Sequence, residues 1–209
     1  MQSCSRGDIL ITTVAFDMGG VLIDFDTDRV LREHFDSRYH DVLNEKVFHA
    51  DVWARLDEGT ERAEDAVRRV VPLLPEPVRP TIAEMLMDFY PYMPPKPDSA
   101  ELVRSLKEAG YRVLLLSNAT PRFFDHYLEV PALTMMDGFL ISALYKTLKP
   151  RREIYDLFCR KFGVRPEECF FTDDRADNVE GARAFGMQAA VFTDVASLKS
   201  ALRDAGVTC

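Results

Sequence analysis

Five short, almost uninterrupted apolar runs constrain the fold of this chain more than any other feature of its sequence. They span residues 9–16, 111–117, 138–142, 169–172 and 188–192. Uninterrupted runs, in contrast to alternating ones, are typical of strands buried on both faces of a parallel sheet. Helix-like stretches separate or follow the later runs, at 99–108, 121–127, 152–162, 178–185 and 196–205, and a glycine soon follows four of these stretches. This rhythm predicts an α/β domain with a doubly wound parallel sheet.

One long segment, residues 26–94, interrupts that rhythm. It has no strand-like run, and its apolar residues recur at helical spacing, as at Val67, Val70 and Val71. Prolines at 91, 94, 95 and 97 follow it and predict a stiff, extended connector. We therefore expect a core made of residues 1–25 and 95–209, with a helical insertion at 26–94 after the first strand.

The composition excludes several classes of function. The chain has 209 residues, with 26 basic against 34 acidic residues and a net charge of −8, which disfavours binding to nucleic acid. No run approaches the roughly 18 apolar residues of a membrane-spanning helix, and we expect neither a membrane anchor nor a signal peptide. The cysteines form no CxxC pair, so we expect free thiols in a reducing cytoplasm; they are Cys4, Cys159, Cys169 and Cys209.

The first run ends at an acidic residue, Asp17. Ligands of parallel α/β sheets bind outside the carboxyl ends of the strands, so a carboxylate there is a candidate for chemistry. Gly19 and Gly20 follow it, and they let the backbone turn sharply and bring N–H groups close to an anion. From this segment alone, an Asp that merely caps a turn is an equally good interpretation.

Polar residues also follow the second and third runs. Ser117 and Asn118 come at the end of the second run, where a hydroxyl and free N–H groups suit a phosphate or a carboxylate. Lys149 stands before Pro150, after the third run. Each signal is weak alone, because Ser and Asn are common helix caps and an exposed lysine before a helix-opening proline is ordinary.

The fourth run ends in two adjacent carboxylates, Asp173 and Asp174. Neighbouring carboxylates repel each other unless a cation lies between them, and Mg²⁺ takes carboxylate and carbonyl oxygens as ligands. A magnesium site is therefore expected at this edge. A second interpretation, compatible with the first, is that Asp177 or Asn178 caps the following helix.

Together, these four strand-end motifs in this order resemble the haloacid dehalogenase (HAD) superfamily of hydrolases. The resemblance covers essentially the whole chain and implies a Rossmann-like core, with the insertion at 26–94 as a small helical cap. Residues 57–60 look like the substrate-facing loop of that cap. Residues 17–26 and 171–181 are most similar to bacterial α-D-glucose-1-phosphate phosphatases.

The resemblance implies a phosphatase that acts on a small phosphorylated metabolite, such as a sugar phosphate, including anomeric ones. Asp17 would be the nucleophile that becomes an aspartyl phosphate, and Lys149 and Ser117 would assist catalysis. The phosphoryl group would be held by Gly20, Ser117, Asn118 and Lys149.

The metal implied by the resemblance is Mg²⁺. Asp174 and Asp17 would be its main protein ligands, with Asp173 as a direct or water-mediated ligand and Gly19 contributing its carbonyl. The role of Asp177 stays open.

The sequence departs from the superfamily at Gly19, where most phosphatases of the family have an Asp that serves as general acid and base. A glycine keeps the carbonyl but has no proton to donate. An anomeric sugar oxygen leaves more easily than an alkyl oxygen, so such a substrate would tolerate this loss.

Two other functions remain open. A 2-haloacid dehalogenase also lacks the second acid but needs no metal, and it has little use for Asp173 and Asp174. A non-catalytic member would bind a phosphorylated ligand without turnover, as the glycine at position 19 allows. The sequence does not indicate the substrate or the oligomeric state, and we expect Trp53 and Tyr92 to serve packing within the insertion.

Overall fold

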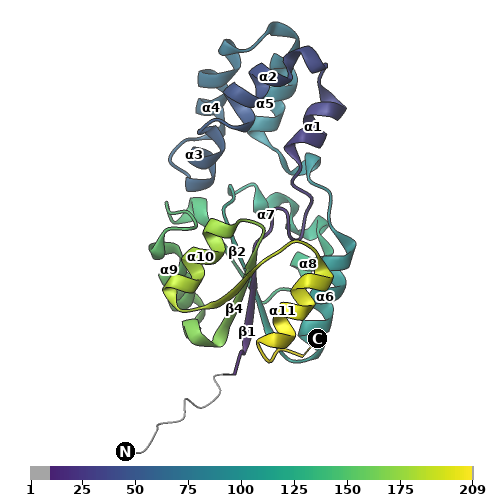
Figure 1. The fold of residues 1–209 in the computed structure, drawn as a ribbon. Helices are drawn as coiled ribbons and strands as arrows, with labels where there is room; N and C mark the ends of the chain where they lie inside the picture. The colour runs from purple at the N-terminus through teal and green to yellow at the C-terminus, as the bar shows by residue number, and fades with distance from the viewer. Residues whose placement is uncertain (1–9, 209) are drawn as a thin grey trace, which may run out of the picture.

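The computed structural model describes residues 10–208 and is built on a five-stranded parallel sheet (Figure 1). Its strands are β1 (Thr13–Phe16), β2 (Arg112–Ser117), β3 (Gly138–Ile141), β4 (Cys169–Asp173) and β5 (Gln188–Val191). They lie in the order β3-β2-β1-β4-β5. The chain winds outwards from β1 to β3, returns, and winds outwards again to β5. The carboxyl ends of β2, β1 and β4 therefore meet where the strand order reverses.

Neighbouring residues of each strand pack against opposite faces of the sheet. In β2, Val113 and Leu115 belong to one hydrophobic cluster, whereas Leu114 and Leu116 belong to another. All four side chains are fully buried. Burial on both faces explains why the strands appear in the sequence as uninterrupted apolar runs.

Two groups of helices cover the two faces (Figure 1). One face packs against α6 (Pro97–Glu108), α8 (Pro131–Thr134) and α11 (Val195–Asp204). The other packs against α9 (Arg152–Phe162) and α10 (Ala176–Phe185). A short helix, α7 (Phe123–His126), lies at the end of the core that faces the insertion.

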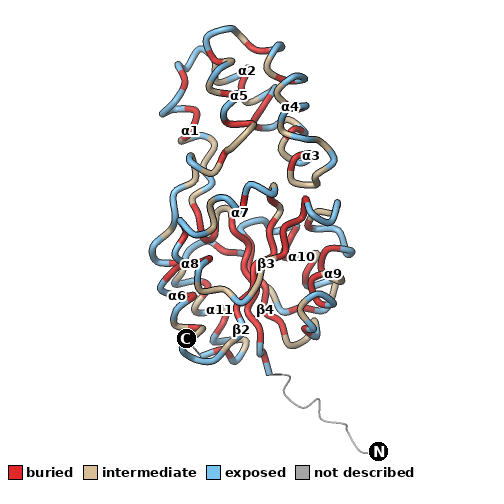
Figure 2. Tube along the Cα trace, turned by 180° about the vertical axis from the view of Figure 1, so that it is seen from behind, coloured by how far each residue is buried: buried red, intermediate tan, exposed pale blue. Residues whose placement is uncertain are grey.

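The insertion between β1 and β2 forms a separate helical layer over the carboxyl ends of the strands (Figure 1). Its α-helices are α1 (Thr27–His34), α2 (His40–Leu43), α3 (Val52–Glu58), α4 (Ala63–Val70) and α5 (Arg79–Met87). Their apolar faces converge on a hydrophobic cluster drawn entirely from the insertion, with Leu43, Val52 and Ile82 among its buried members. Figure 2 shows this buried group apart from the buried strands of the core. The insertion is the cap of the molecule.

Two connectors join the cap to the core. They are bonded to each other, since the backbone N–H of Asp24 donates to the carbonyl of Pro94 at 2.8 Å. The guanidinium of Arg29 ties both connectors to α1, with bonds of 3.1 Å to the Asp24 carboxylate and 3.0 Å to the carbonyl of Tyr92. The cap therefore enters and leaves the core at one point.

The doubly wound α/β fold with a helical cap after the first strand is confirmed. Element ends differ by a few residues. β1 begins at Thr13, later than expected, and residue 9 lies outside the described residues. The expected helix at 121–127 is shorter, since α7 covers Phe123–His126 and a 3-10 turn follows at Tyr127–Glu129.

One capping expectation is wrong. Helix α10 begins at Ala176, so Asp177 and Asn178 lie inside its first turn, and the capping position is occupied by Arg175. The thiols of Cys159 and Cys169 are free, as expected, and both are buried, whereas Cys4 and Cys209 lie outside the described residues. Within residues 10–208, the helices are all too short or too polar to cross a membrane.

Candidate active site

Three polar side chains come together at the carboxyl ends of the central strands. Asp17 directly follows β1, Ser117 ends β2, and Asp173 ends β4. β1 pairs in parallel with both neighbours, and the backbone N–H of Asp17 continues the ladder by donating to the carbonyl of Thr172 at 2.8 Å. This register places Asp17 beside Asp173 at the point where the strand order reverses. The side chains are nearly or fully withdrawn from solvent.

Lys149 reaches into this group from the loop after β3. Its Nζ lies 2.7 Å from Oδ1 of Asp17 and 2.6 Å from Oδ2 of Asp173, and it donates to the carbonyl of Leu116 at 2.9 Å. Burial alone would lower the pKa of Lys149, but the two carboxylates outweigh it and raise that pKa above its ordinary value. Lys149 is therefore a fixed positive charge beside Asp17.

The loop after Asp17 has one position that only glycine fits. Gly20 has φ +70°, and a Cβ there would lie 2.5 Å from Oδ2 of Asp174. Gly19 differs, since its φ lies outside the left-handed range and a Cβ would meet the Cβ of Phe25 at an ordinary 3.7 Å. The backbone thus requires glycine at position 20, whereas position 19 accepts a side chain.

The carboxylates of Asp17, Asp173 and Asp174 fit a hard cation. Each offers one oxygen, and these oxygens lie within 4.8 Å of one another. Lys149 compensates only one of the three negative charges, and an all-oxygen donor set is the kind that Mg²⁺ prefers. Asp174 is exposed and has no ion-pair partner among residues 10–208, so its carboxylate is available for a metal.

Of the three carboxylates, Asp173 has the fewest free lone pairs with which to bind a metal ion directly. Its Oδ1 accepts hydrogen bonds of 2.9 Å from the side-chain amide of Asn178 and from the backbone N–H of Arg175, while Oδ2 accepts from Lys149. These contacts use three of the roughly four lone-pair positions of a carboxylate. Asp173 is therefore suited to orient Lys149, with any contact to a metal made through water.

Asn178 is a site residue that the sequence analysis interpreted only as a helix cap. It lies five residues after Asp173, on the inner side of α10, where its amide reaches back to the end of β4. Asp177 points elsewhere, into an exposed ion pair of 2.7 Å with Arg175. That hydrogen-bonded partner lowers the pKa of Asp177, and the residue stays outside the carboxylate group.

The loop after β2 is bonded to the lysine segment. The amide of Asn118 accepts from the backbone N–H of Lys149 at 2.9 Å and donates to its carbonyl at 3.1 Å. Ser142 adds a second link, because its hydroxyl accepts from the backbone N–H of Ala119 at 2.9 Å. Asn118 and Ser142 therefore set the positions of the loops that carry the expected phosphate contacts.

A cavity of about 980 Å³ opens between this group and the cap. Its core side is lined by Asp17, Gly19, Asn118, Lys149 and Asp174. Ser117 and Gly20, both expected to bind the phosphoryl group, are absent from the residues that line this cavity, and Ser117 is buried beneath its surface.

The carboxylates in this cavity have perturbed pKa values. Burial raises the pKa of Asp17 to about 7, with Lys149 opposing the change and Asp173 adding to it. Partial desolvation at the cavity wall also raises the pKa of Asp174, although its side chain stays exposed, with Asp173 as a second cause. A divalent cation held by these groups would lower both pKa values and keep Asp17 ionised.

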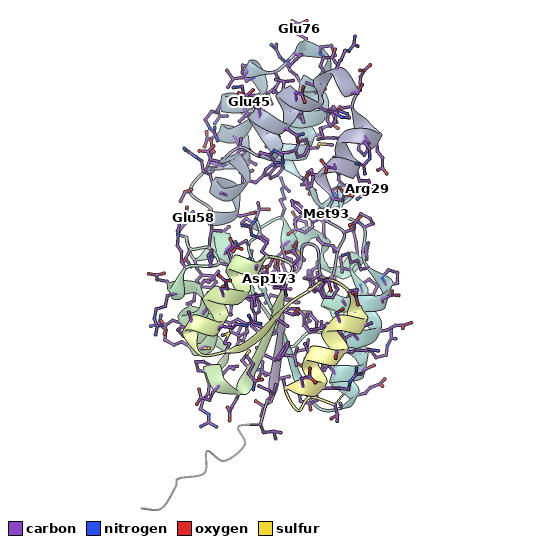
Figure 3. All side chains as sticks on the ribbon, in the orientation of Figure 1. Arg29, Glu45, Glu58, Glu76, Met93 and Asp173 are labelled. Atoms are coloured by element: carbon purple, nitrogen blue, oxygen red, sulfur yellow. The ribbon has the colours of Figure 1, made fainter. Side chains whose placement is uncertain are left out.

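The last residues of α3 and the glycine that follows them, a segment we call the α3 loop, dock the cap onto the core. Figure 3 shows Glu58 at the edge of the cap that faces the strand ends. Three contacts join this loop to the core: Ser142 Oγ to the carbonyl of Asp57 at 2.5 Å, Lys146 Nζ to the carbonyl of Gly59, and Arg151 to Glu58. These contacts hold the loop against the segment that follows β3.

A second contact joins the cap to α7. His126 hydrogen-bonds the carboxylate of Asp88 at 2.7 Å and stacks on Tyr90 with ring centroids 5.2 Å apart. Burial would lower the pKa of His126, but the hydrogen bond to Asp88 raises it above its ordinary value. The cap is thus supported on two sides of the cavity.

Aromatic side chains form the cap side of the cavity. Trp53 packs against Phe89 with ring centroids 4.9 Å apart, as expected, and it also lines the cavity. Tyr92 stacks on Phe89 at 5.6 Å and serves packing, as expected. Phe25 lies beside Gly19 at the base of this aromatic wall.

Comparison with known proteins agrees with this geometry. The model of the haloacid dehalogenase-like hydrolase family matches residues 11–186. A sesquiterpene phosphatase from Aspergillus oryzae is 26% identical over 184 residues, covering 86% of this chain and 88% of that protein. An (S)-2-haloacid dehalogenase from Burkholderia cepacia is 34% identical over 109 residues, or 52% of this chain. That match spans only 47% of the dehalogenase.

Solved structures share the fold at low sequence identity. A HAD family enzyme from Bacteroides thetaiotaomicron, solved with magnesium and inorganic phosphate, superposes with a TM-score of 0.71 at 21% identity, covering 90% of this chain and 98% of that one. The specific likeness to α-glucose 1-phosphate phosphatases stays a prediction. Since the family model spans most of the sequence, the chain belongs to the haloacid dehalogenase-like hydrolases.

Proposed function

We propose that this hydrolase is a magnesium-dependent phosphatase that works through an aspartyl phosphate on Asp17. The observation that carries the proposal is the group of one buried lysine and three carboxylates at the strand ends, where Lys149 contacts Asp17 at 2.7 Å. A nucleophilic carboxylate needs help to approach an anionic phosphate, and the fixed ammonium beside it supplies part of that help.

Each residue has a distinct task in this proposal. Asp17 attacks phosphorus, and Lys149 stabilises the negative charge that spreads over the phosphoryl oxygens. Asp174 and Asp17, with the carbonyl of Gly19, would hold Mg²⁺, which would neutralise charge between nucleophile and substrate. Asp173 keeps Lys149 in place. Asn118, which lines the cavity, is the proposed phosphate contact beside Lys149, and Gly20 and the Ser117 hydroxyl lie behind this lining.

The comparisons support this proposal. Relatives include a sesquiterpene phosphatase and a D-ribitol-5-phosphate phosphatase from Bacteroides thetaiotaomicron, the latter 22% identical over 189 residues. A structural neighbour was solved with magnesium and inorganic phosphate. We place the substrate among small phosphorylated metabolites, and among sugar phosphates in particular. A cavity of about 980 Å³ has room for such a molecule.

A 2-haloacid dehalogenase is the second candidate, because several relatives carry that name. That reaction has no phosphoryl group to neutralise and needs no metal. The carboxylate of Asp174, which faces the cavity without an ion-pair partner among the described residues, favours the phosphatase.

The test is phosphate release from a panel of phosphorylated metabolites, with Mg²⁺ and with excess chelator, beside halide release from (S)-2-haloacids. We expect phosphate release only with Mg²⁺. In Asp17→Asn, activity should fall by a factor on the order of 10³ or more, because an amide cannot accept the phosphoryl group. Asp24→Asn is the matched control, since that carboxylate pairs with Arg29 outside the cavity lining. Halide release in chelator, or an active Asp17→Asn, would overturn the proposal.

A further inference from the structure

The proposed reaction needs a proton at the oxygen that leaves phosphorus, and the nucleophile loop has none to give. Position 19 is a glycine and therefore has no side chain, although a Cβ there would meet its nearest neighbour, the Cβ of Phe25, at an ordinary 3.7 Å. Asp24, the next acid along the chain, is held by Arg29 at 3.1 Å. Neither the nucleophile loop nor the segment that follows it therefore supplies a general acid.

We propose that Asp57, carried by the cap, is the general acid and base of this site; the inference rests on the proposed phosphatase function. In an in-line displacement the leaving oxygen points away from Asp17, towards the cap. Asp57 lines the cavity on that side, within electrostatic range of both Asp17 and Lys149.

The backbone of Asp57 is held in place by the core. Its carbonyl accepts the hydrogen bond of 2.5 Å from Ser142 Oγ, and Ser142 is itself bonded to the loop after β2. Two residues later, Gly59 has φ +66°, and a Cβ there would lie 2.4 Å from the carbonyl of Ala143. This close approach of the two backbones holds the end of α3, which carries Asp57, against the segment that follows β3.

The other carboxyl groups of the cavity lining are already engaged. Within residues 10–208, five of them have a basic ion-pair partner: Glu61 with Arg69, Glu64 with Arg62, Asp88 with His126, Asp125 with Arg122 and Asp177 with Arg175. Asp17 pairs with Lys149, and Asp174 is the proposed metal ligand. Asp57 is the remaining carboxyl group of the lining, and it has no ion pair in the described part of the chain.

The environment of Asp57 favours the protonated form. Desolvation where the end of α3 docks on the core is the main cause that raises the pKa of Asp57 to about 8, with Asp17 adding to it and Lys149 opposing it. A carboxylic acid that keeps its proton near neutral pH can donate it. Tyr90, which also lines the cavity, is a poorer donor because burial raises the pKa of its phenol still further from neutrality.

The protons balance over the two steps. In the first step, an oxygen of Asp17 forms a bond to phosphorus, the bond from phosphorus to the substrate oxygen breaks, and Asp57 gives its proton to that oxygen. The products are an alcohol, the aspartyl phosphate and the Asp57 carboxylate. In the second step, water attacks phosphorus and passes a proton to Asp57, while the bond between phosphorus and Asp17 breaks. Phosphate leaves, and both residues return to their starting forms.

The test is a leaving-group series measured with Mg²⁺ on the wild type, Asp57→Asn, Asp57→Glu and Glu58→Gln. The series runs from nitrophenyl phosphate, whose leaving group needs no proton, to glycerol phosphate and a hexose 6-phosphate. A general acid is worth about 10² to 10⁴ in rate, so Asp57→Asn should lose about that factor in kcat/KM on the alkyl phosphates and less than about tenfold on nitrophenyl phosphate. With nitrophenyl phosphate it should also show a burst of nitrophenol, because the second step lacks its base.

Glu58→Gln separates chemistry from docking. Glu58 belongs to the same loop and pairs with Arg151, so its loss should change the whole series by one factor. The Asn variant keeps the backbone contact with Ser142, and Asp57→Glu should recover part of the alkyl rate. A loss in Asp57→Asn that is equal across the series, or no loss, would overturn the inference while leaving the phosphatase proposal intact. A wild type that releases no phosphate even from nitrophenyl phosphate would overturn both.

Discussion

Removing Lys149 is the perturbation whose cost follows most directly from the structure. Lys149→Met keeps the length of the side chain but deletes three contacts of 2.6 to 2.9 Å, with Asp173, Asp17 and the carbonyl of Leu116. Breaking a buried ion pair by removing one partner typically costs about 3–5 kcal/mol, because the other charge is left uncompensated. For a chain of this size, each kcal/mol lowers the Tm by about 2–4 °C, so we expect a fall on the order of 6–20 °C.

The loss should depend on pH. The pKa of Asp17 is already raised by burial to about 7, and without Lys149 it rises further. A carboxyl group whose pKa is higher in the folded than in the unfolded state costs stability as pH rises from its unfolded pKa, near 4, through the folded value. Lys149→Met should therefore be less destabilised at about pH 5, where Asp17 is protonated, than at about pH 8.

Urea denaturation followed by circular dichroism at the two pH values measures this. Lys107→Met is the matched control, since its ion pair with Asp137 is only partly buried and should be worth about 1 kcal/mol or less. Lys149→Met combined with Asp173→Asn should be less destabilised than the sum of the two single variants, because one orphaned charge is gone. A Lys149→Met protein within about 1 kcal/mol of the wild type at pH 8 would refute this account of the buried lysine.

Three further outcomes are expected. Asp174→Ala should abolish Mg²⁺-dependent activity, whereas Asp177→Ala should keep most of it, as a metal titration of phosphate release would show. Equal losses in the two variants would contradict the proposal that Asp174 is a metal ligand. Gly19→Asp should fold, since its Cβ has ordinary contacts, and in the Asp57→Asn background it should restore alkyl phosphate hydrolysis, as measured with glycerol phosphate. If the double variant folds but hydrolyses glycerol phosphate no faster than Asp57→Asn, an acid at position 19 does not substitute for the one at position 57. Burial would lower the pKa of His126, but its hydrogen bond to Asp88 of the cap raises that pKa. The stabilisation that His126 gives the fold is therefore complete below its unfolded pKa of about 6.5 and is lost as the pH rises through its pKa in the folded state. His126→Gln should therefore lower the unfolding free energy by up to about 1 kcal/mol at pH 6 and by less at pH 9, and an equal loss at both would contradict this.

The fold class was predictable because burial on both faces of a sheet requires apolar residues at successive positions of each strand. Residues 111–117 appear in the sequence as an apolar run for the reason that Leu114 and Leu115 pack on opposite clusters. Element ends were less predictable, since they depend on the partner strand. β1 begins only at Thr13, opposite Arg112 and Cys169, although the apolar run starts earlier.

The candidate site was predictable in part. Asp17, Lys149, Asp173 and Asp174 stand out in the sequence because parallel strands carry their carboxyl ends to one edge of the sheet. The division of labour among them was not predictable. That Asp173 is committed to Lys149 and Asn178 depends on how α10 packs against β4, and a strand-end motif contains no information about the lone pairs of its carboxylate.

The sequence by itself determined which strands end in acidic, hydroxyl or amide residues, where the insertion lies in the chain, and that position 19 has no acidic side chain. Only the tertiary structure decided what stands opposite the nucleophile. Asp57 and Ser142 are 85 positions apart in the chain, and their bond of 2.5 Å exists because the cap docks on the loop after β3. Local patterns report burial and turns, since these act on neighbouring residues. A contact between two packed bodies depends on the shape of both, and no single segment records it.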